Sequence, residues 1–417
     1  MGEKQLCYAS GEIAASTYKH PSKIRNSGDK AKLISSNDES GFTYRGRFAG
    51  KEEAVSVSYE YSQKIHNALR WLISKQGAAL DSMTVIVWAS NMQDVPDAQN
   101  KFIEDDDLMF EDDTDEIPTT APMYMTLLKK RIFGYRDKLE PNTKVMIMGL
   151  DAATTGRINI SFYSELEGSR FLNNIESWHT CTACLRFSGR NKKSLVNSFS
   201  LYEIIRCAFG NEQGAFIDCD KKLMKDNVLR LLMCVTDGRP VPEDIIHGLY
   251  FKASNPLAYD NAYNHRTVLE TACGIIRKSM IERNKPEQEG EYLMAYDPNE
   301  TNRSYLYGCL LAIADKAESE AYDGNERNER VTNARRYWNA FSQRPYQTWG
   351  IIEERLRPYM DKLGKAQVKY AKWINEITSK MNSDEFSNNS RLEPLYLLGY
   401  HHFTGYMYTK PENKEEE

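Results

Sequence analysis

The sequence contains one compact group of residues suited to metal or thiol chemistry, His179-Thr-Cys181-Thr-Ala-Cys184. Two cysteines separated by two residues can direct both sulfurs to one centre, which suits zinc binding or redox exchange. No second close pair follows, and Cys207 or Cys219 could complete a site only if folding brings them near. The simpler interpretation is structural thiols. The alternative hypothesis is a zinc- or thiol-dependent nucleic-acid enzyme that uses His179, Cys181 and Cys184.

Other catalytic signatures are missing from the sequence. It has no phosphate-binding Gly-x-x-x-x-Gly-Lys-Ser/Thr, no Gly-x-Gly-x-x-Gly and no Gly-x-Ser-x-Gly. His401-His402 lies in an aromatic stretch, which indicates packing or the rim of a site. Asp151 precedes Thr154-Thr155-Gly156-Arg157, which is typical of a turn between strands, where Arg157 could meet a phosphate. We therefore predict no catalytic residue, no metal site and no cofactor.

The composition predicts a globular chain. It has 417 residues, of which 41% are hydrophobic and 27% are charged, and the formal net charge is −5. This length allows two or three domains. No apolar run approaches a membrane span, and residues 1–6 lack the apolar core of a signal peptide. The eight scattered cysteines indicate free thiols in a reducing compartment. We expect a cytoplasmic protein.

Opposite charges are segregated along the chain. Between Asn91 and Glu116, eleven carboxylates stand against Lys101 alone, which gives that segment a charge of −10 and the rest of the chain +5. Such a block is typical of a solvated loop. Residues 19–51 carry +5 with Phe42, Tyr44 and Phe48 interleaved, and residues 331–380 carry +6. Local basic surfaces attract phosphates even on an acidic protein.

The candidate phosphate contacts come mainly from these two basic stretches. An expected helix over 365–381 places four lysines on one face and an apolar stripe on the other, although a solvated surface would show the same pattern. Phe42, Tyr44 and Trp338 could stack on bases, and core packing is the simpler interpretation of each. The nucleic-acid-binding candidates are Lys19, Lys23, Arg25, Lys32, Arg45, Arg47, Lys64, Arg70, Arg157, Arg335, Arg336, Arg344, Lys365, Lys369 and Lys372.

Hydrophobic periodicity predicts a mixed first part. A helix is predicted over 52–75, because apolar residues recur there at three- and four-residue steps: Ala54, Val57, Tyr61, Ile65, Ala68 and Leu72. Residues 84–88 read as a buried strand and 123–135 as a helix. Residues 144–150 and 157–163 are expected to form two strands that 151–156 joins.

The later sequence is predominantly helical. Helices are predicted over 195–209, 221–235, 243–252, 263–283, 302–320, 329–341, 348–362 and 365–381, and residues 392–408 form a last apolar segment. Residues 284–291 (Asn-Lys-Pro-Glu-Gln-Glu-Gly-Glu) are the best linker candidate. The predicted fold class is α+β, with a mixed α/β region at 1–165, a mainly helical region at 166–290 and a helical bundle at 291–417.

Several longer strings resemble the large subunit of the type I-C (Dvulg subtype) CRISPR interference complex, Cascade. They run from near residue 7 to about residue 403, so the resemblance covers essentially the whole chain. The strings are Cys7-Tyr-Ala-Ser-Gly11-Glu12, Ala31-Lys32-Leu33-Ile34-Ser35-Ser36-Asn37-Asp38, Phe42-Thr43-Tyr44-Arg45-Gly46-Arg47-Phe48, His66-Asn67-Ala68-Leu69-Arg70-Trp71-Leu72, Gly149-Leu150-Asp151-Ala152, Trp178-His179, Tyr337-Trp338-Asn339-Ala340-Phe341-Ser342-Gln343-Arg344-Pro345 and Leu398-Gly399-Tyr400.

The resemblance implies a non-catalytic subunit of an RNA-guided surveillance complex. Guide RNA would recognise the target by pairing, while the protein binds target DNA and stabilises the R-loop. The implied partners are the guide RNA, the target DNA, the backbone and guide-processing Cascade subunits and a helicase–nuclease effector, with no membrane. The bundle at 291–417 is similar to the small subunit of the complex, which in this subtype can arise from an internal start; Met294 is a candidate for it.

The resemblance also raises an expectation about the N-terminus. Family members are longer, and an N-terminal portion that contributes to reading the protospacer-adjacent motif is expected to be absent from this chain. Such a product could be a truncated subunit or a fragment of a split one.

Overall fold

The chain divides into two compact units. The computed structural model describes residues 3–35, 48, 51–104, 117–154, 156–188, 193–284, 294–322 and 330–408. The first unit comprises Met1–Asp97 and Gly134–Leu172, and the second comprises Ala98–Phe133 and Asn173–Glu417. Helices and strands are mixed in the first unit, and helices predominate in the second, so the predicted α+β class is confirmed.

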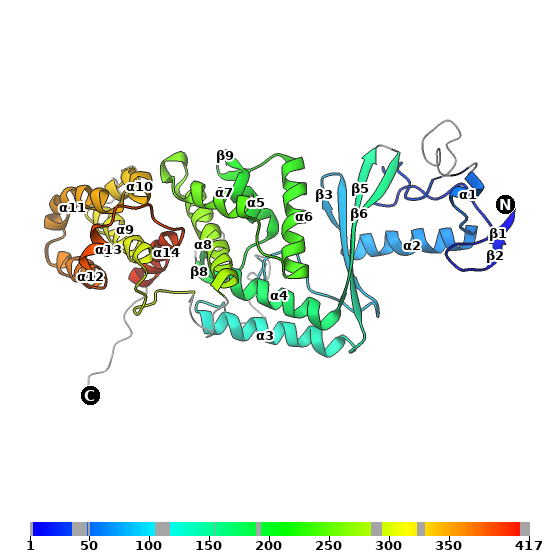
Figure 1. Cartoon of the computed structure of the whole chain (residues 1–417), viewed down its shortest axis with the longest axis horizontal. Helices are drawn as coiled ribbons and strands as arrows, with labels where there is room; N and C mark the ends of the chain where they lie inside the picture. Colours follow the sequence, from blue (N-terminus) through cyan, green and yellow to red (C-terminus); the bar gives the residue numbers. More distant parts are fainter. Residues whose placement is uncertain are drawn as a thin grey trace. The chain divides into compact units, whose positions relative to one another are not determined.

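A four-stranded antiparallel sheet organises the first unit (Figure 1). Its strands follow chain order: β3 (Ala78–Leu80), β4 (Met83–Ala89), β5 (Lys144–Thr154) and β6 (Arg157–Glu167). The three predicted strands are confirmed. β5 and β6 are longer than predicted, however, because the expected joining segment 151–156 mostly continues the hairpin, with register shifts at Gly149/Leu150 and Ala152/Thr154.

The core of this unit lies between the sheet and α2 (Tyr59–Gln76). Leu69 and Leu72 of the helix pack against Ile86, Leu150 and Ile158 of the sheet, all of them buried. The remaining elements of the unit are short: β1 (Lys4–Leu6) pairs with β2 (Ile13–Ala15), and α1 (Lys51–Ala54) forms a single turn.

The predicted helix over 52–75 was wrong in its start, and not all of its periodic apolar residues are buried. The chain leaves helical structure after Ala54, and Ser58 caps α2 by accepting a hydrogen bond from the Tyr61 backbone nitrogen. Tyr61 and Ile65 are each 38% exposed, whereas Ser62 and His66 are buried. Polar side chains can occupy a core when they are hydrogen-bonded, and apolar periodicity does not detect them.

The second unit begins with helices and small hairpins. α3 (Ala121–Lys138) and α4 (Gly168–Thr182) contribute residues to both units. The elements that follow are β7 (Cys184–Ser188), β8 (Lys193–Asn197), α5 (Leu201–Phe209), β9 (Asn211–Gln213), β10 (Phe216–Asp218), α6 (Lys221–Asp237), α7 (Glu243–Ala253), η1 (Pro256–Ala258) and α8 (Ala262–Asn284).

The predicted helix over 195–209 was wrong in its first part. Leu195–Asn197 belongs to β8, which pairs with β7, and α5 starts only after Ser200, whose side chain accepts from the Glu203 backbone nitrogen. A serine at the N-cap position satisfies a backbone nitrogen of the first helical turn, and the helix therefore begins directly after it. The two hairpins β7–β8 and β9–β10 are too short and too polar to produce a clear alternation in the sequence.

The C-terminal helices pack around α9 (Arg303–Glu320), which is buried over most of its length. They are α10 (Asn333–Gln343), α11 (Pro345–Lys362), η3 (Gly364–Ala366), α12 (Gln367–Ser379), α13 (Ser383–Ser387) and α14 (Leu395–Tyr408). The predicted helix over 365–381 is shorter, because Lys365 lies in η3. The predicted linker lies outside the described residues apart from Asn284, which ends α8.

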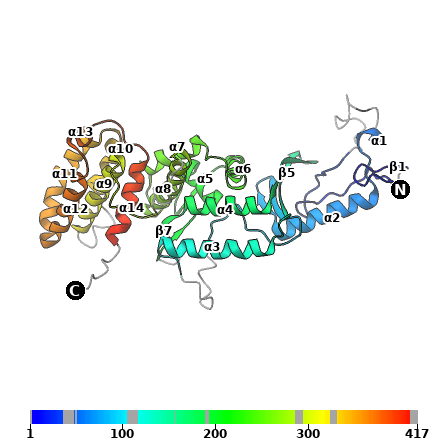
Figure 2. The same cartoon turned by 60° about the horizontal axis from the view of Figure 1, so that its bottom comes forward.

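Helix α14 packs on both α9 and α8 (Figure 2). The Cys273 thiol donates to the Leu397 carbonyl oxygen at 3.4 Å, and the Tyr396 hydroxyl donates to the Ser254 hydroxyl at 2.5 Å. The residues after 291 are therefore in buried contact with the helices before the linker. None of the helices in the described ranges is long and apolar enough to cross a membrane.

Candidate nucleic-acid interface

The His179–Cys184 group lies in the core instead of lining a cleft. Burial lowers the pKa of His179 to about 4, and its Nδ1 lies 2.8 Å from the Ser198 hydroxyl. The Cys184 thiol is buried, and it donates to the Glu270 carbonyl oxygen at 3.5 Å. Burial raises the pKa of Cys184, which keeps the thiol protonated and poorly nucleophilic. This environment favours the structural interpretation of the motif.

The described residues also lack a metal-binding cluster. Within those ranges, no group of three or more His, Cys, Asp and Glu side chains is placed to hold an ion. Cys181 is half-buried next to Ser177, with 4.0 Å between sulfur and hydroxyl oxygen. His401 lines a cavity, whereas His402 is buried and its Nδ1 lies 3.2 Å from the Tyr305 hydroxyl.

Helix α12 has the two faces that its sequence predicts. Tyr370 and Ile377 are fully buried against the bundle core. Lys365, Lys369 and Lys372 are exposed, and their spacing places them on one side. Within the described residues, no carboxylate forms an ion pair with Lys365 or Lys372. Lys365 of η3 and Lys372 of α12 therefore present two uncompensated positive charges to solvent.

Two other lysines of this face have protein partners. The Lys369 ammonium lies 3.1 Å from a Glu320 carboxylate oxygen, and it also lies 4.7 Å from the centre of the Tyr370 ring. Lys380 donates to the Tyr296 hydroxyl at 3.0 Å and to the Pro298 carbonyl oxygen at 2.7 Å. A phosphate would have to compete with these contacts, so both lysines are weaker candidates.

The candidates of α10 separate into structural and exposed cations. Arg335 Nε lies 3.2 Å from an oxygen of buried Asp315, which makes it part of the bundle's internal network. Arg336 and Arg344 are exposed, and among the described residues neither forms an ion pair. Trp338 is 1% exposed and donates to the Tyr396 hydroxyl at 3.0 Å, so its interpretation as core packing is confirmed.

The N-terminal candidates are also mixed. Lys19 and Lys23 are exposed. Arg25 is largely buried, and its Nε lies 2.8 Å from Asp29. Arg70 donates to the Ser22 and Lys23 carbonyl oxygens at 2.5 and 3.1 Å. It thereby holds the turn in which Lys23 adopts a φ of 58°, an uncommon value for a residue with a side chain.

The structure brings two distant candidates together. Lys32 forms an isolated parallel bridge with Arg157: its backbone nitrogen donates to the Gly156 oxygen, and its own oxygen accepts from the Ile158 nitrogen. The two cationic residues therefore lie on neighbouring chain segments at the end of the hairpin where β5 connects to β6. Lys64 is exposed but lies 2.6 Å from a Glu60 carboxylate oxygen. Arg45, Arg47, Phe42 and Tyr44 lie outside the described residues.

The candidate set omits three exposed cations of α11. Arg355 lies 5.1 Å from the centre of the Tyr337 ring, and Lys362 lies 5.8 Å from that of Tyr359. Arg357 is exposed as well. The sequence gives no sign of a basic surface here, because the negative charges of Glu353, Glu354 and Asp361 cancel the positive charges of these cations in the local net charge.

Comparison with known proteins identifies the family to which the chain belongs. The model of a family described as "CRISPR-associated protein (Cas_Csd1)" matches residues 1–407. The chain is thus a CRISPR-associated protein of the Cascade-subunit class. It belongs to the Cas_Csd1 family. No curated protein matches the chain. The resemblance inferred from the sequence is confirmed at this level, while the type I-C subtype and the absent N-terminal portion stay predictions.

Proposed function

We propose that the protein is the non-catalytic large subunit of a type I-C CRISPR surveillance complex, where it binds target DNA and stabilises the R-loop. In this role guide RNA pairs with the target strand, and the protein contacts nucleic-acid backbones through positive charge. Its partners would be the guide RNA, the target DNA, the backbone and guide-processing Cascade subunits and the helicase–nuclease, which it helps to recruit. Membership of the Cas_Csd1 family supports this assignment.

The observation that carries the DNA-binding proposal is the exposed lysine face that continues from η3 into α12. Lys365 and Lys372 have no carboxylate partner among the described residues, although the protein as a whole is acidic. The opposite face of the helix is fixed in the core by Tyr370 and Ile377. A fixed helix with unpaired lysines can neutralise phosphates without moving, and it reads no sequence.

A second positive site supports the same function. Lys32 and Arg157 occupy neighbouring positions in the first unit, and Lys19 and Lys23 are exposed in the same unit. Arg336 and Arg344 add exposed charge to the C-terminal helices. We exclude Arg25 and Arg335 from the proposed contacts because carboxylates already bind their guanidinium groups.

The test is the salt dependence of target binding by the assembled complex. Lys365→Glu combined with Lys372→Glu should weaken binding without changing sequence preference. It should also reduce the slope of log affinity against log salt by about two, since each lost phosphate contact contributes about 0.7–0.9. The matched control is Lys221→Glu with Lys222→Glu, which makes the same charge change at exposed positions of α6. An unchanged slope in the α12 variant would contradict the proposal.

The rival hypothesis of a zinc- or thiol-dependent enzyme has a separate test. Elemental analysis of purified protein should find zinc well below one equivalent, because His179 and Cys184 are engaged in core hydrogen bonds. Stoichiometric zinc, lost together with nuclease or exchange activity in Cys181→Ser, would favour the rival.

A further inference from the structure

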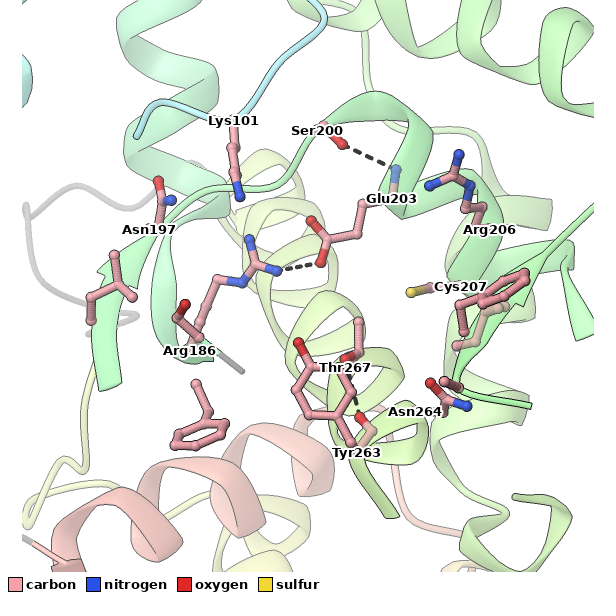
Figure 3. Close-up of a pocket in the computed structure, with 16 residues that line it drawn as sticks. Lys101, Arg186, Asn197, Ser200, Glu203, Arg206, Cys207, Tyr263, Asn264 and Thr267 are labelled. Carbon is pink, nitrogen blue, oxygen red and sulfur yellow. Dashed lines mark hydrogen bonds and ion pairs between the residues drawn. The ribbon is translucent and has the colours of Figure 1, made fainter. Parts of the chain in front are cut away.

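A cavity of about 370 Å³ opens between β7, α5 and α8 in the second unit (Figure 3). Its floor is the Arg186–Glu203 ion pair, and the ammonium of Lys101 and the hydroxyl of Tyr263 point toward this pair from opposite sides. The volume falls in the range of small-ligand pockets and is sufficient for one nucleotide. The side chains lining it include acceptors, donors, aromatic rings and cations.

The floor is rigid. The Arg186 guanidinium lies 4.1 Å from the centre of the Phe199 ring and donates to the Ser198 carbonyl oxygen at 2.8 Å. Its Nε is buried and makes no hydrogen bond within the described part of the chain. Glu203 is fixed at the start of α5 by the Ser200 cap. A guanidinium beside a carboxylate offers both donors and acceptors to the polar edge of an unpaired base.

The rim suits stacking and phosphate binding. Tyr263 is 43% exposed and Phe216 is 60% exposed, which is unusual for large rings that line a cavity. Arg206 is exposed beside them and forms no ion pair within the described ranges. Sites that bind single-stranded nucleic acid usually combine aromatic rings, on which bases stack, with adjacent cations that contact phosphates.

A second cavity of about 660 Å³ adjoins the first, because both are lined by Arg186, Phe187 and Tyr263. It extends to α9 and α14, where the Lys316 ammonium lies over the exposed Tyr408 ring, 4.2 Å from its centre. Tyr263 thus lines both cavities. That arrangement fits successive nucleotides of a strand better than one free nucleotide.

We propose that the Arg186–Glu203 cavity holds one unstacked nucleotide of a single strand, with its base against Tyr263 and Phe216 and its phosphate near Arg206. This inference rests on the proposed function and adds a location for the unpaired strand. The strand could be the displaced DNA or an unpaired part of the guide RNA, since the recognising chemistry is the same. Paired bases are excluded because their polar edges are occupied in a duplex.

The test is photo-crosslinking in the assembled complex with target DNA. One set of duplexes carries 5-iodo-2′-deoxyuridine at successive positions of the displaced strand, and one set of guides carries 5-iodouridine. Mapping should place a crosslink on Tyr263 or Phe216 from one narrow register. A crosslink from the DNA set identifies the displaced strand, and one from the guide set identifies the RNA; either supports the proposal.

Variants make the test sharper. Tyr263→Ala should lose the Tyr263 crosslink and weaken R-loop binding about 5-fold or more, as removal of one stacked base does, whereas Tyr263→Phe should retain binding. Phe133→Ala, which removes a ring that is 69% exposed and lies outside the cavity, is the control. Permanganate reactivity of displaced thymines reports R-loop formation independently.

The two proposals fail in different ways. An R-loop that forms normally with no crosslink to either ring from any position overturns the cavity proposal and leaves the proposed function standing. The same holds if Tyr263→Ala binds as the unaltered protein does. If the complex forms no R-loop with target DNA, the proposed function fails and the cavity proposal fails with it.

Discussion

Gly308 of α9 and Gly399 of α14 each lie against the backbone of the other's helix. A Cβ atom at Gly308 would overlap the Tyr396 carbonyl oxygen, and one at Gly399 would overlap the Tyr305 carbonyl oxygen. The Cys309 thiol donates to the Gly399 carbonyl oxygen at 3.5 Å across the same contact. The last helix can therefore approach the centre of the bundle only because both positions lack a side chain.

Alanine at either glycine should destabilise the protein. Gly308→Ala forces two backbones apart, and we expect the free energy of unfolding to fall by about 3 kcal/mol, at the upper end of the usual cost of overpacking. Urea unfolding measures this. The control is Gly350→Ala in α11, where a Cβ would meet nothing within 4 Å; it should stabilise the helix by about 0.5–1 kcal/mol. Equal effects of the two variants would refute the close approach.

Substitution by methionine should affect stability at Arg335 and DNA binding at Arg336. Asp315 accepts from Arg335, from the Thr332 hydroxyl at 2.5 Å and from the Tyr400 hydroxyl at 2.5 Å. Burial alone would raise the pKa of Asp315, but Arg335 and these hydroxyls hold it below its usual value. Removing the cation leaves a buried carboxylate without its charge partner.

Arg335→Met should therefore lower the free energy of unfolding by about 2–4 kcal/mol, less than for a fully buried pair because the Arg335 side chain is 42% exposed. Arg336→Met should change it by less than about 0.5 kcal/mol and should instead reduce the salt slope of DNA binding by about one. Thermal melts and binding titrations of both variants check this. If the Arg335→Met protein is as stable as the unaltered protein but binds DNA more weakly, Arg335 contacts DNA and its exclusion from the proposed contacts is wrong.

The sequence predicted elements better than faces and partners. The strands at β4, β5 and β6 and most helices were found because each is a long apolar pattern. The β7–β8 hairpin was missed because its strands are short and half-buried. Apolar periodicity did not reveal the buried Ser62 and His66 of α2, whose polar groups have local partners. The Ser62 hydroxyl lies 2.9 Å from His20 Nδ1, and His66 Nδ1 lies 2.6 Å from the Ser62 backbone carbonyl oxygen.

The same limit applied to the candidate interface. Charge along the sequence located the basic stretches, and α12 has the expected lysine face. It could not show that Asp315, from α9, would bind Arg335, or that Asp29 would bind Arg25. Nor could it bring Lys32 next to Arg157, because that contact is a bridge between residues far apart in the chain. The Arg186–Glu203 cavity left no signal because its residues come from separate elements.

Thiol reactivity should divide the eight cysteines by burial. Cys181 and Cys219 are half-buried and the other six are buried. Native protein should therefore expose about two thiols to Ellman's reagent, and the urea-unfolded protein eight. Cys7 is an informative case: burial raises its pKa, but hydrogen bonds from Ser10 and Ser58 lower it to about 6. Its protection would then reflect access, not protonation.

Cys181→Ser should remove one of the two fast thiols and leave the slow ones unchanged. A zinc site at Cys181 and Cys184 would give a different result, because both thiols would be protected in native protein and would become reactive only on release of the metal. Measuring released zinc alongside the thiol count distinguishes the two cases.

Buried neutral histidines should make the protein sensitive to acid. Burial lowers the pKa of His179, and likewise of His265, His401 and His20, to about 4 in each case. A histidine that titrates near 6.5 when unfolded and near 4 when folded binds more protons in the unfolded state. The contribution of such a histidine to the free energy of unfolding is complete above about pH 6.5 and is lost as the pH falls to 4. For a group as buried as His179 this loss is about 3 kcal/mol.

Glu270 acts in the opposite direction. Burial raises its pKa to about 7, although the Arg186 charge opposes that shift. Its contribution is therefore complete below about pH 4.5 and is lost as the pH rises to 7. Burial also raises the pKa of Glu318. These two carboxyl groups do not offset the four histidines, so the free energy of unfolding should fall on acidification from pH 6.5.

His179→Gln gives the sharpest test of this balance. The variant loses a hydrogen bond to Ser198, so its stability at pH 7 should be lower, but its pH dependence should be shallower. Around pH 5 the slope of the free energy of unfolding should decrease by about 1.4 kcal/mol per pH unit, which corresponds to one proton. Urea unfolding at pH 5, 6 and 7 measures it, with Trp178 of the same helix as a fluorescence probe. Parallel curves for His179→Gln and the unaltered protein would mean that His179 is charged in the fold, and that its buried contact with Ser198 is not the neutral one inferred from the structure.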